Sequence, residues 1–151
     1  MSGPSYTKGG GQREPFGGQE YLRSTADVKK ESYTFAAASL PTETIDGVVQ
    51  KVLKPGEVLA KITSGADSGK VGVFMAGVTD GRQTLANIVG VNDTWLPWQL
   101  MEHDCTVAAT YEATVVQAWC TERDAAGLRI ALTNTTIDAM RGTKGLSIQA
   151  K

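Results

Sequence analysis

The sequence contains little cysteine, almost no histidine and no long apolar run. Its 151 residues include two cysteines and one histidine. Two cysteines cannot form the disulfide framework of a small secreted domain, so we expect Cys105 and Cys120 to be reduced, buried side chains. A single bridge between neighbouring strands is the alternative. No apolar run approaches the ~20 residues that cross a bilayer, and no secretory signal is visible, so we expect no membrane partner.

The sequence also lacks an excess of charge of either sign. Lysine and arginine number 15, aspartate and glutamate number 16, and the formal net charge is −1. Such a balance produces no broad attraction to a phosphate backbone or an anionic membrane surface. We therefore expect no direct contact with nucleic acid.

The first 31 residues are poor in aliphatic side chains and rich in glycine. They contain a glycine triplet, a glycine pair and two prolines, and alone they cannot bury enough apolar surface to fold. The sequence therefore predicts an extended arm over residues 1–31 and a β-rich domain over residues 32–151. Spaced apolar side chains in the arm suit pockets on a partner: Tyr6, Phe16, Tyr21 and Leu22. A disordered tail is the alternative.

Short apolar segments separated by turns recur from residue 32 onward. The predicted strands are residues 32–37, 48–53, 58–62, 71–76, 85–91, 106–111, 114–121 and 146–148. A short helix is predicted at residues 136–141, with Thr135 as its N-cap and Gly142 at its C-terminal end. Turns about every ten residues indicate a mainly β fold, a small barrel or sandwich with one short C-terminal helix.

Two segments resemble catalytic or binding motifs, but their spacing is unsuitable. Glu102 to Cys105 supplies His103, Asp104 and Cys105, yet neighbouring side chains of an extended segment point to opposite faces, and no second histidine exists. Residues 65–70 place three residues between their glycines where a phosphate-binding loop has four, and Val71 replaces the required hydroxyl. We therefore predict no catalytic residue, no bound metal and no cofactor, and we expect that the protein is not an enzyme.

Two tryptophans lie close together after the turn-like Asn92-Asp93. Trp95 and Trp98 enclose a leucine and a proline, which gives a large apolar surface on a predicted loop. Because tryptophan is enriched at the centres of protein interfaces, we predict that these residues contribute to a subunit interface. The alternative is that both complete the domain's own core.

Several turns resemble those of one known family. Residues 53–63, LKPGEVLAKIT, are similar to the strand–turn–strand entry of head decoration proteins of tailed bacteriophages, also called capsid cement or stabilising proteins. Residues 69–71 and 79–89, TDGRQTLANIV, resemble the segments that follow, and the resemblance extends from about Val48 to Ile148. The sequence differs in having Ala86-Asn87-Ile88 where the family has a glycine, and in its longer, glycine-richer arm.

The resemblance implies a structural protein of the virion, made in the host cytoplasm and bound to the outer surface of the phage capsid. It implies a homotrimer that stabilises the shell by clamping neighbouring major capsid proteins, and an arm of this kind can add a strand to a partner's sheet edge. Another virion module, such as a head spike base or tail component, is the alternative. A small trimeric β enzyme of the dUTPase type is a remote one, because its nucleotide-binding and carboxylate motifs are not recognisable.

Overall fold

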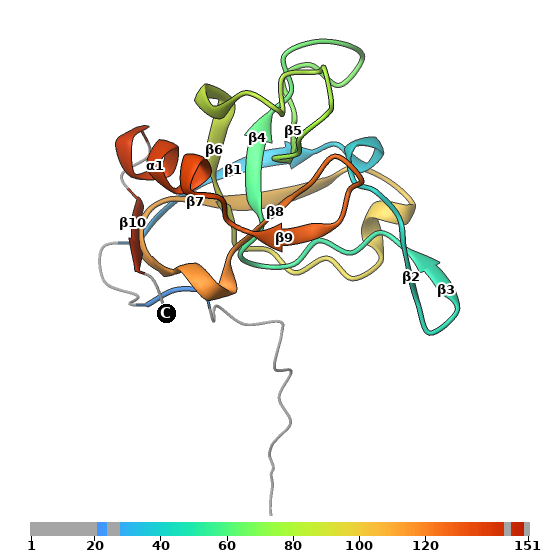
Figure 1. Ribbon diagram of the computed structural model, residues 1–151. Coiled ribbons are helices and arrows are strands. Elements are labelled where there is room, and N and C mark those ends of the chain that lie inside the picture. Colours follow the sequence, from blue (N-terminus) through green and yellow to red (C-terminus); the bar gives the residue numbers. More distant parts are fainter. Residues whose placement is uncertain (1–20, 24–27, 144–145, 150–151) are drawn as a thin grey trace, which may run out of the picture.

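The computed structural model describes residues 21–23, 28–143 and 146–149, which form a mainly β fold with one α-helix (Figure 1). The strands are β1 (Lys29–Phe35), β2 (Glu43–Ile45), β3 (Val48–Gln50), β4 (Val58–Lys61), β5 (Val71–Val73), β6 (Ile88–Asn92), β7 (Cys105–Val116), β8 (Thr121–Arg123), β9 (Arg129–Ala131) and β10 (Leu146–Gln149). The helix is α1 (Asn134–Thr143), and short 3-10 turns form η1 (Ala37–Ser39), η2 (Leu85–Asn87), η3 (Gln99–Met101) and η4 (Gln117–Trp119). The predicted mainly β class is confirmed.

Six strands form one sheet in the order β1-β5-β4-β6-β7-β10. Strand β1 also pairs antiparallel with β7, so the strands β1, β5, β4, β6 and β7 form a closed circuit of neighbours. Strands β1 and β5, however, meet at a single residue pair, Phe35 with Val71. The arrangement is therefore sandwich-like and does not close into a true barrel.

Strand β7 is the longest strand of the described residues and the one with most partners. The sequence predicted two strands here, but Glu112 and Ala113 are not turn residues, and the strand runs without a break to Val116. It pairs with β1 and β6 in its first part and with β10, in parallel, in its last part. The second predicted strand ends early because η4 separates β7 from β8.

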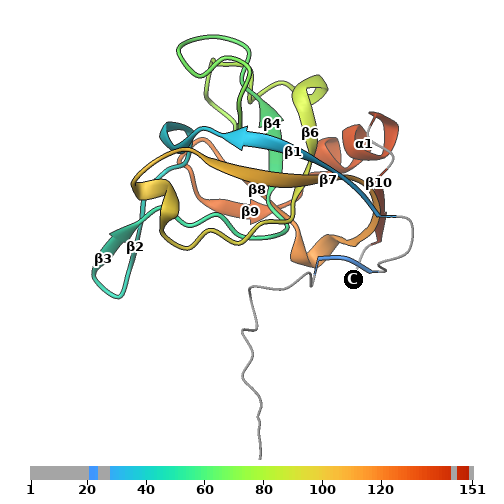
Figure 2. The same cartoon turned by 180° about the vertical axis from the view of Figure 1, so that it is seen from behind.

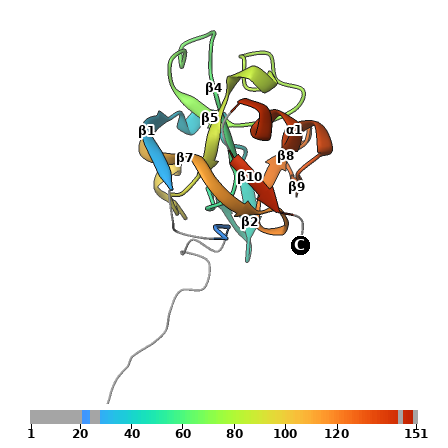
Figure 3. The same cartoon turned by 90° about the vertical axis from the view of Figure 1, so that its left-hand side faces the viewer.

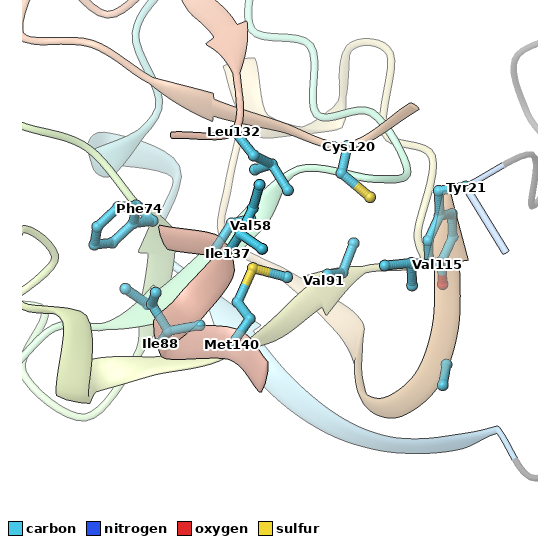
Figure 4. Packing of buried hydrophobic residues seen from close by; sticks show 12 residues of the cluster. Tyr21, Val58, Phe74, Ile88, Val91, Val115, Cys120, Leu132, Ile137 and Met140 are labelled. Carbon is cyan, nitrogen blue, oxygen red and sulfur yellow. The ribbon is translucent and has the colours of Figure 1, made fainter. Parts of the chain in front are cut away.

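Alternation along the strands divides the core into two clusters. In β4, Val58 and Ala60 belong to one cluster, and Leu59 belongs to the other. The first cluster lies beneath α1, which contributes Ile137 and Met140 from one helix face (Figure 4). Figure 3 shows β1 and α1 on opposite sides of β6 and β7.

Helix α1 begins earlier than the sequence predicted. Its cap is Thr133, whose hydroxyl oxygen accepts a hydrogen bond from the backbone N–H of Thr136 at 3.3 Å, and not Thr135. The helix then continues to Thr143, past the glycine expected to stop it. No helix in the described part of the chain has both the length and the apolarity needed to cross a membrane.

The β2–β3 hairpin is largely exposed, and the strand predicted over residues 48–53 includes β3 but not β2 or the turn between them. Its two-residue turn is Asp46-Gly47, with φ angles of 52° and 79°, and Ile45 pairs with Val48 across it. Both φ values are positive, as a type I′ turn requires, and Asp-Gly is a preferred pair there. The hairpin projects away from the sandwich in two opposite views (Figures 1 and 2).

Candidate functional site

A groove of about 700 Å³ lies between the β2–β3 hairpin and the loop that follows β6. Its walls are mostly apolar, with one carboxylate and one ammonium group among them. The lining residues are Ile45, Asp46, Val48, Gln50, Val52, Lys54, Trp95 and Pro97. Ile45 and Val48 pair directly and therefore share the face of the hairpin that meets the groove. We call this feature the hairpin groove.

The two tryptophans predicted at a subunit interface both lie on this side of the molecule. Trp95 is half-buried and lines the hairpin groove, whereas Trp98 is 51% exposed. Leu96, between them, is buried and exchanges two backbone hydrogen bonds of 3.0 Å with Leu53. Met101, at the end of η3, adds a second large exposed apolar side chain to this rim. The loop thus buries its leucine and directs apolar surface outward.

A charged network fixes the hairpin to the body of the protein. The guanidinium of Arg129, on β9, donates two hydrogen bonds to the carboxylate of Glu43, of 2.8 and 2.9 Å. It also donates to the carbonyl oxygen of Val52 at 2.8 Å and to Glu57 at 3.3 Å. Burial alone would raise the pKa of Glu43, but the hydrogen bonds and charge of Arg129 outweigh it and lower that pKa. The hairpin base is therefore held by a bidentate ion pair.

The turn at the edge of the groove is fixed by a second, buried ion pair. Glu57 and Arg123 are both buried, and Arg123 Nε lies 2.8 Å from Glu57 Oε1. The other Glu57 oxygen accepts the backbone N–H of Lys54 at 2.8 Å, and Arg123 donates to the carbonyl oxygen of Gly127. Removing Glu57 would leave the buried Arg123 guanidinium without its carboxylate partner. Glu57 therefore joins the turn to the β8–β9 hairpin.

The structure corrects the role predicted for Tyr21 and places Leu22 against the core. The Tyr21 ring is 1% exposed within the first core cluster (Figure 4). Its hydroxyl hydrogen-bonds to Asp93 and Thr110. Leu22 forms an antiparallel bridge with Val115 and packs against the same cluster. An aromatic ring in an extended segment packs against any sheet surface that has room for it. Here that surface belongs to this chain's own β7. Tyr21 is therefore not available to bind a capsid.

The remaining arm predictions concern residues beyond this segment. Tyr6 and Phe16 lie outside the described residues. Strand β1 begins at Lys29, so the boundary predicted at residue 31 falls inside a strand. The ordered domain thus includes residues that the sequence assigned to the arm.

The cluster around His103 does not have the geometry of an activated thiol. Cys105 Sγ lies 3.6 Å from His103 Nδ1, but the Asp104 carboxylate faces away from that pair. It accepts a hydrogen bond from Lys70 Nζ at 2.6 Å and one from the backbone N–H of Ala37. Burial and the neighbouring Asp104 raise the pKa of Cys105, which reduces its thiolate fraction.

The other side chains considered as candidate reactive groups are buried or form local ion pairs. Lys70, the lysine of the loop over residues 65–70, binds both Asp67 and Asp104, and these hydrogen bonds raise its pKa to about 12. Cys120 is buried and both cysteines are free, although Cys105 is only partly buried. Among the described residues, no three His, Cys, Asp or Glu side chains are grouped so that they could hold a metal ion.

Among the residues that line the hairpin groove, the sequence analysis identified only Trp95 as a site residue. Ile45 and Val48 were not predicted as site residues, although the Asp-Gly pair between them is a strong hairpin signal. Trp119, 60% exposed in η4, was also missed, and no pattern in the sequence distinguishes it from a core tryptophan.

The hairpin groove is suited to holding another protein surface. Apolar walls with a few polar groups and exposed aromatic side chains are the features that dominate protein interfaces. No protein-family model matches the chain, and a search of curated proteins finds no match. The exposed apolar surface and its rigid base are therefore the observations on which a function can be inferred.

Proposed function

We propose that this protein is a capsid decoration protein, which binds the outer surface of a phage head as a homotrimer and stabilises the shell. The observation that carries the proposal is the apolar surface that a single chain leaves uncovered. It consists of the hairpin groove together with the exposed side chains of Trp98 and Met101. A rigid base of ion pairs holds this surface in place, as a permanent contact requires.

Association between copies would bury this surface favourably. Buried apolar area contributes about 25 cal/mol per Å², and a stable interface covers about 800 Å² on each partner. A trimer then presents three capsid contacts at once, and effective concentration makes three weak contacts strong. Shell stabilisation requires multivalent contacts of this kind and does not require any covalent bond to be made or broken.

The segments that resemble decoration proteins also support the proposal. Residues 53–63 form a tight turn followed by β4, a strand whose first three residues are buried. Residues 79–89 include a turn in which Asp80 binds Arg82, and they continue into η2 and β6. The turns that carry the resemblance thus occur between sheet strands, where a structural family would retain them.

The capsid contact assigned to the arm is restricted to the residues before Tyr21. Tyr21 and Leu22 pack against this chain's own sheet, which leaves Tyr6 and Phe16 as the proposed apolar anchors. Binding of such a segment must offset the entropy lost when it orders, and aromatic side chains are efficient in doing so. The contact with major capsid protein is made by residues 1–20 in this proposal.

Size-exclusion light scattering and head binding test the proposal together. We expect trimers at micromolar concentration, and co-sedimentation with DNA-filled heads that lack a decoration protein. Trp98→Ser should weaken trimer formation at least tenfold, because an exposed aromatic at an interface centre is costly to lose. Leu128→Ser is the matched control, since Leu128 is also an exposed large apolar side chain, at 64%, but lies between β8 and β9.

Two results would contradict the proposal. A stable monomer at every concentration, combined with monomers on the head, would exclude the trimer. Failure to bind heads, combined with binding to purified tails, would favour the alternative of another virion module.

A further inference from the structure

We propose that Asp46 is a site of spontaneous covalent modification, at which the main chain converts from an aspartyl to an isoaspartyl linkage. The reacting groups are the side-chain carboxyl of Asp46 and the backbone nitrogen of Gly47. Aspartate followed by glycine is especially prone to this rearrangement, because glycine has no side chain to hinder attack by its own nitrogen. The chain contains two such pairs, Asp46-Gly47 and Asp80-Gly81, and the fold immobilises only the second.

The reaction needs only the chain itself and water. The nitrogen of Gly47 attacks the side-chain carboxyl carbon of Asp46. The amide hydrogen, the carboxyl hydrogen and one carboxyl oxygen leave as water, which closes a succinimide ring. Water then opens the ring: attack at the side-chain carbon restores aspartate, whereas attack at the main-chain carbon leaves the chain linked through the side chain. One water is released and one is consumed, so the product is an isomer and no oxidant or reductant takes part.

The Asp46-Gly47 pair has the freedom that ring closure requires. Both residues are exposed at the tip of the β2–β3 hairpin, and a Cβ placed on Gly47 would meet no other atom within 4 Å. Within the described part of the chain, the Asp46 carboxylate forms no ion pair and no hydrogen bond. Strands β2 and β3 pair only with each other there, and a two-stranded hairpin alone is marginally stable. The tip should therefore open often and allow the backbone rotation that brings the two groups together.

The Asp80-Gly81 pair is an internal comparison, because hydrogen bonds hold each group that would have to move. The Asp80 carboxylate accepts hydrogen bonds from Arg82 Nε at 3.0 and 3.1 Å and from the backbone N–H of Arg82 at 3.2 Å. The Gly81 nitrogen, which would be the nucleophile, donates to Gln83 Oε1 at 3.0 Å. The Asp80 carbonyl oxygen accepts the backbone N–H of Thr63 at 2.8 Å, and Gly81 is buried. The two pairs thus share a sequence and differ in freedom.

Isomerisation at Asp46 would disrupt the hairpin turn. The isoaspartyl linkage adds the Cβ methylene to the main chain, whereas the two-residue turn fixes the register in which Ile45 pairs with Val48. Both of these residues line the hairpin groove, so the modified chain loses one wall of the groove. Loss of that wall would also weaken the trimer, a consequence that rests on the proposed function, whereas the modification itself does not.

Peptide mapping of stored protein tests the site. The full chain is incubated at physiological temperature and mildly acidic pH in water enriched in heavy oxygen, because ring opening adds an oxygen from the solvent. Chromatography then separates the aspartyl and isoaspartyl forms of the peptides that contain positions 46 and 80. We expect isoaspartate to accumulate at position 46 at least about tenfold faster than at position 80, since an immobilised segment opens less often than an exposed tip. In urea-unfolded protein the two positions should react at similar rates.

The Trp98→Ser variant separates this inference from the proposed function. Association at the hairpin groove would cover Asp46, so isomerisation should be faster in this variant, whose trimer is weakened, than in the unchanged chain. Equal isomerisation of Asp46 in both chains would support the modification site and contradict a subunit interface at the groove. The inference is overturned if position 46 stays unmodified in both chains, or if positions 46 and 80 react equally in the folded protein.

Asp46→Asn gives a second measurement at the same turn. Asparagine also accepts the positive φ of this position, and its amide leaves as ammonia more readily than a carboxyl oxygen leaves as water. We expect this variant to lose its side-chain amide and give a mixture of aspartyl and isoaspartyl chains, faster than the unchanged chain isomerises. Mass spectrometry follows the exchange of nitrogen for oxygen. An amide that persists at position 46 would contradict the freedom inferred for the tip.

Discussion

The phenol of Tyr21 joins the start of the described chain to residues far along the sequence. Its hydroxyl donates to Asp93, 72 residues away, and lies 2.8 Å from the hydroxyl of Thr110, 89 residues away. Burial, and then the hydrogen bond to Asp93, raise the pKa of Tyr21 well above its usual value, so the phenol stays protonated. Asp93 in turn accepts a 2.7 Å hydrogen bond from Lys30. One side chain thereby attaches the segment before β1 to β6 and β7.

Replacing Tyr21 measures this attachment. Tyr21→Phe should lower the free energy of unfolding by about 1–2 kcal/mol, because it removes the hydrogen bonds but keeps the ring. Tyr21→Ala should lower it by about 3–5 kcal/mol, since it also leaves a cavity. Urea unfolding followed by tryptophan fluorescence gives both values. Tyr33→Phe is the control, because the Tyr33 hydroxyl donates to the exposed Glu31 carboxylate, and an equal loss there would contradict the argument.

The two thiols should react at very different rates. Burial raises the pKa of Cys120 to about 12, and burial followed by the charge of Asp104 raises the pKa of Cys105. Alkylation requires the thiolate, so at pH 8 iodoacetamide should modify Cys105 more slowly than a free cysteine and leave Cys120 unmodified. Mass spectrometry before and after unfolding in urea measures both. Rapid modification of Cys120 in the folded protein would mean that the first core cluster opens readily.

At the scale of elements, the hairpin depends on one arginine at its base. Arg129→Lys removes the planar fork that binds Glu43 with two hydrogen bonds, and a lysine cannot replace both. We expect faster hydrogen exchange at the β2–β3 amides and a loss of about 1–3 kcal/mol in the free energy of unfolding. Glu112→Gln, which breaks the exposed ion pair with Lys29, is the matched control and should have little effect.

The same ion pair makes the hairpin sensitive to acid. Because the pKa of Glu43 is lower in the folded protein, its contribution to stability is complete above the unfolded value of about 4.3 and is lost as the pH falls toward the folded value. Hydrogen exchange of the hairpin amides, corrected for intrinsic rates, should therefore be constant between pH 5 and 7 and increase below about pH 4. In Glu43→Gln this acid-dependent increase should be smaller. An unchanged acid response would show that other carboxylates control the hairpin.

For the whole molecule, two truncations separate the arm from the domain. Deleting residues 1–20 should leave the thermal unfolding temperature nearly unchanged and reduce head binding sharply, because it removes Tyr6 and Phe16. Deleting residues 1–31 should also lower the unfolding temperature, since it removes Tyr21 from the core and the first residues of β1. Calorimetry and co-sedimentation with heads measure the two effects. Undiminished head binding by the shorter truncation would exclude the arm as the attachment.

The residues of the chain differ in how far their structure could be predicted from sequence. A short apolar run between two turn segments located β4, where Val58, Leu59 and Ala60 are all buried. The strand predicted over residues 48–53 includes β3, but β2 and the Asp46-Gly47 turn were missed, because β2 is only three residues long. The hairpin groove could not be predicted, since it joins residues near 45 and 95 that meet only in the folded chain. The burial of Tyr21 could not be predicted either, because its hydrogen-bond partners Asp93 and Thr110 lie 72 and 89 residues away in the sequence.

The position of β7 has a consequence for the order in which the chain folds. During synthesis β1 leaves the ribosome long before its partner, because Lys29 pairs with Glu112, 83 residues later. Such distant contacts must overcome a large loop-closure entropy, and they make folding slow. Strands β6 and β7 are close in sequence and can pair first, after which β1 and β10 add to the exposed edges of β7. A nascent chain that stops before residue 105 therefore leaves β1 without its main partner, and folding of the sandwich has to wait until residues 105–112 have been made.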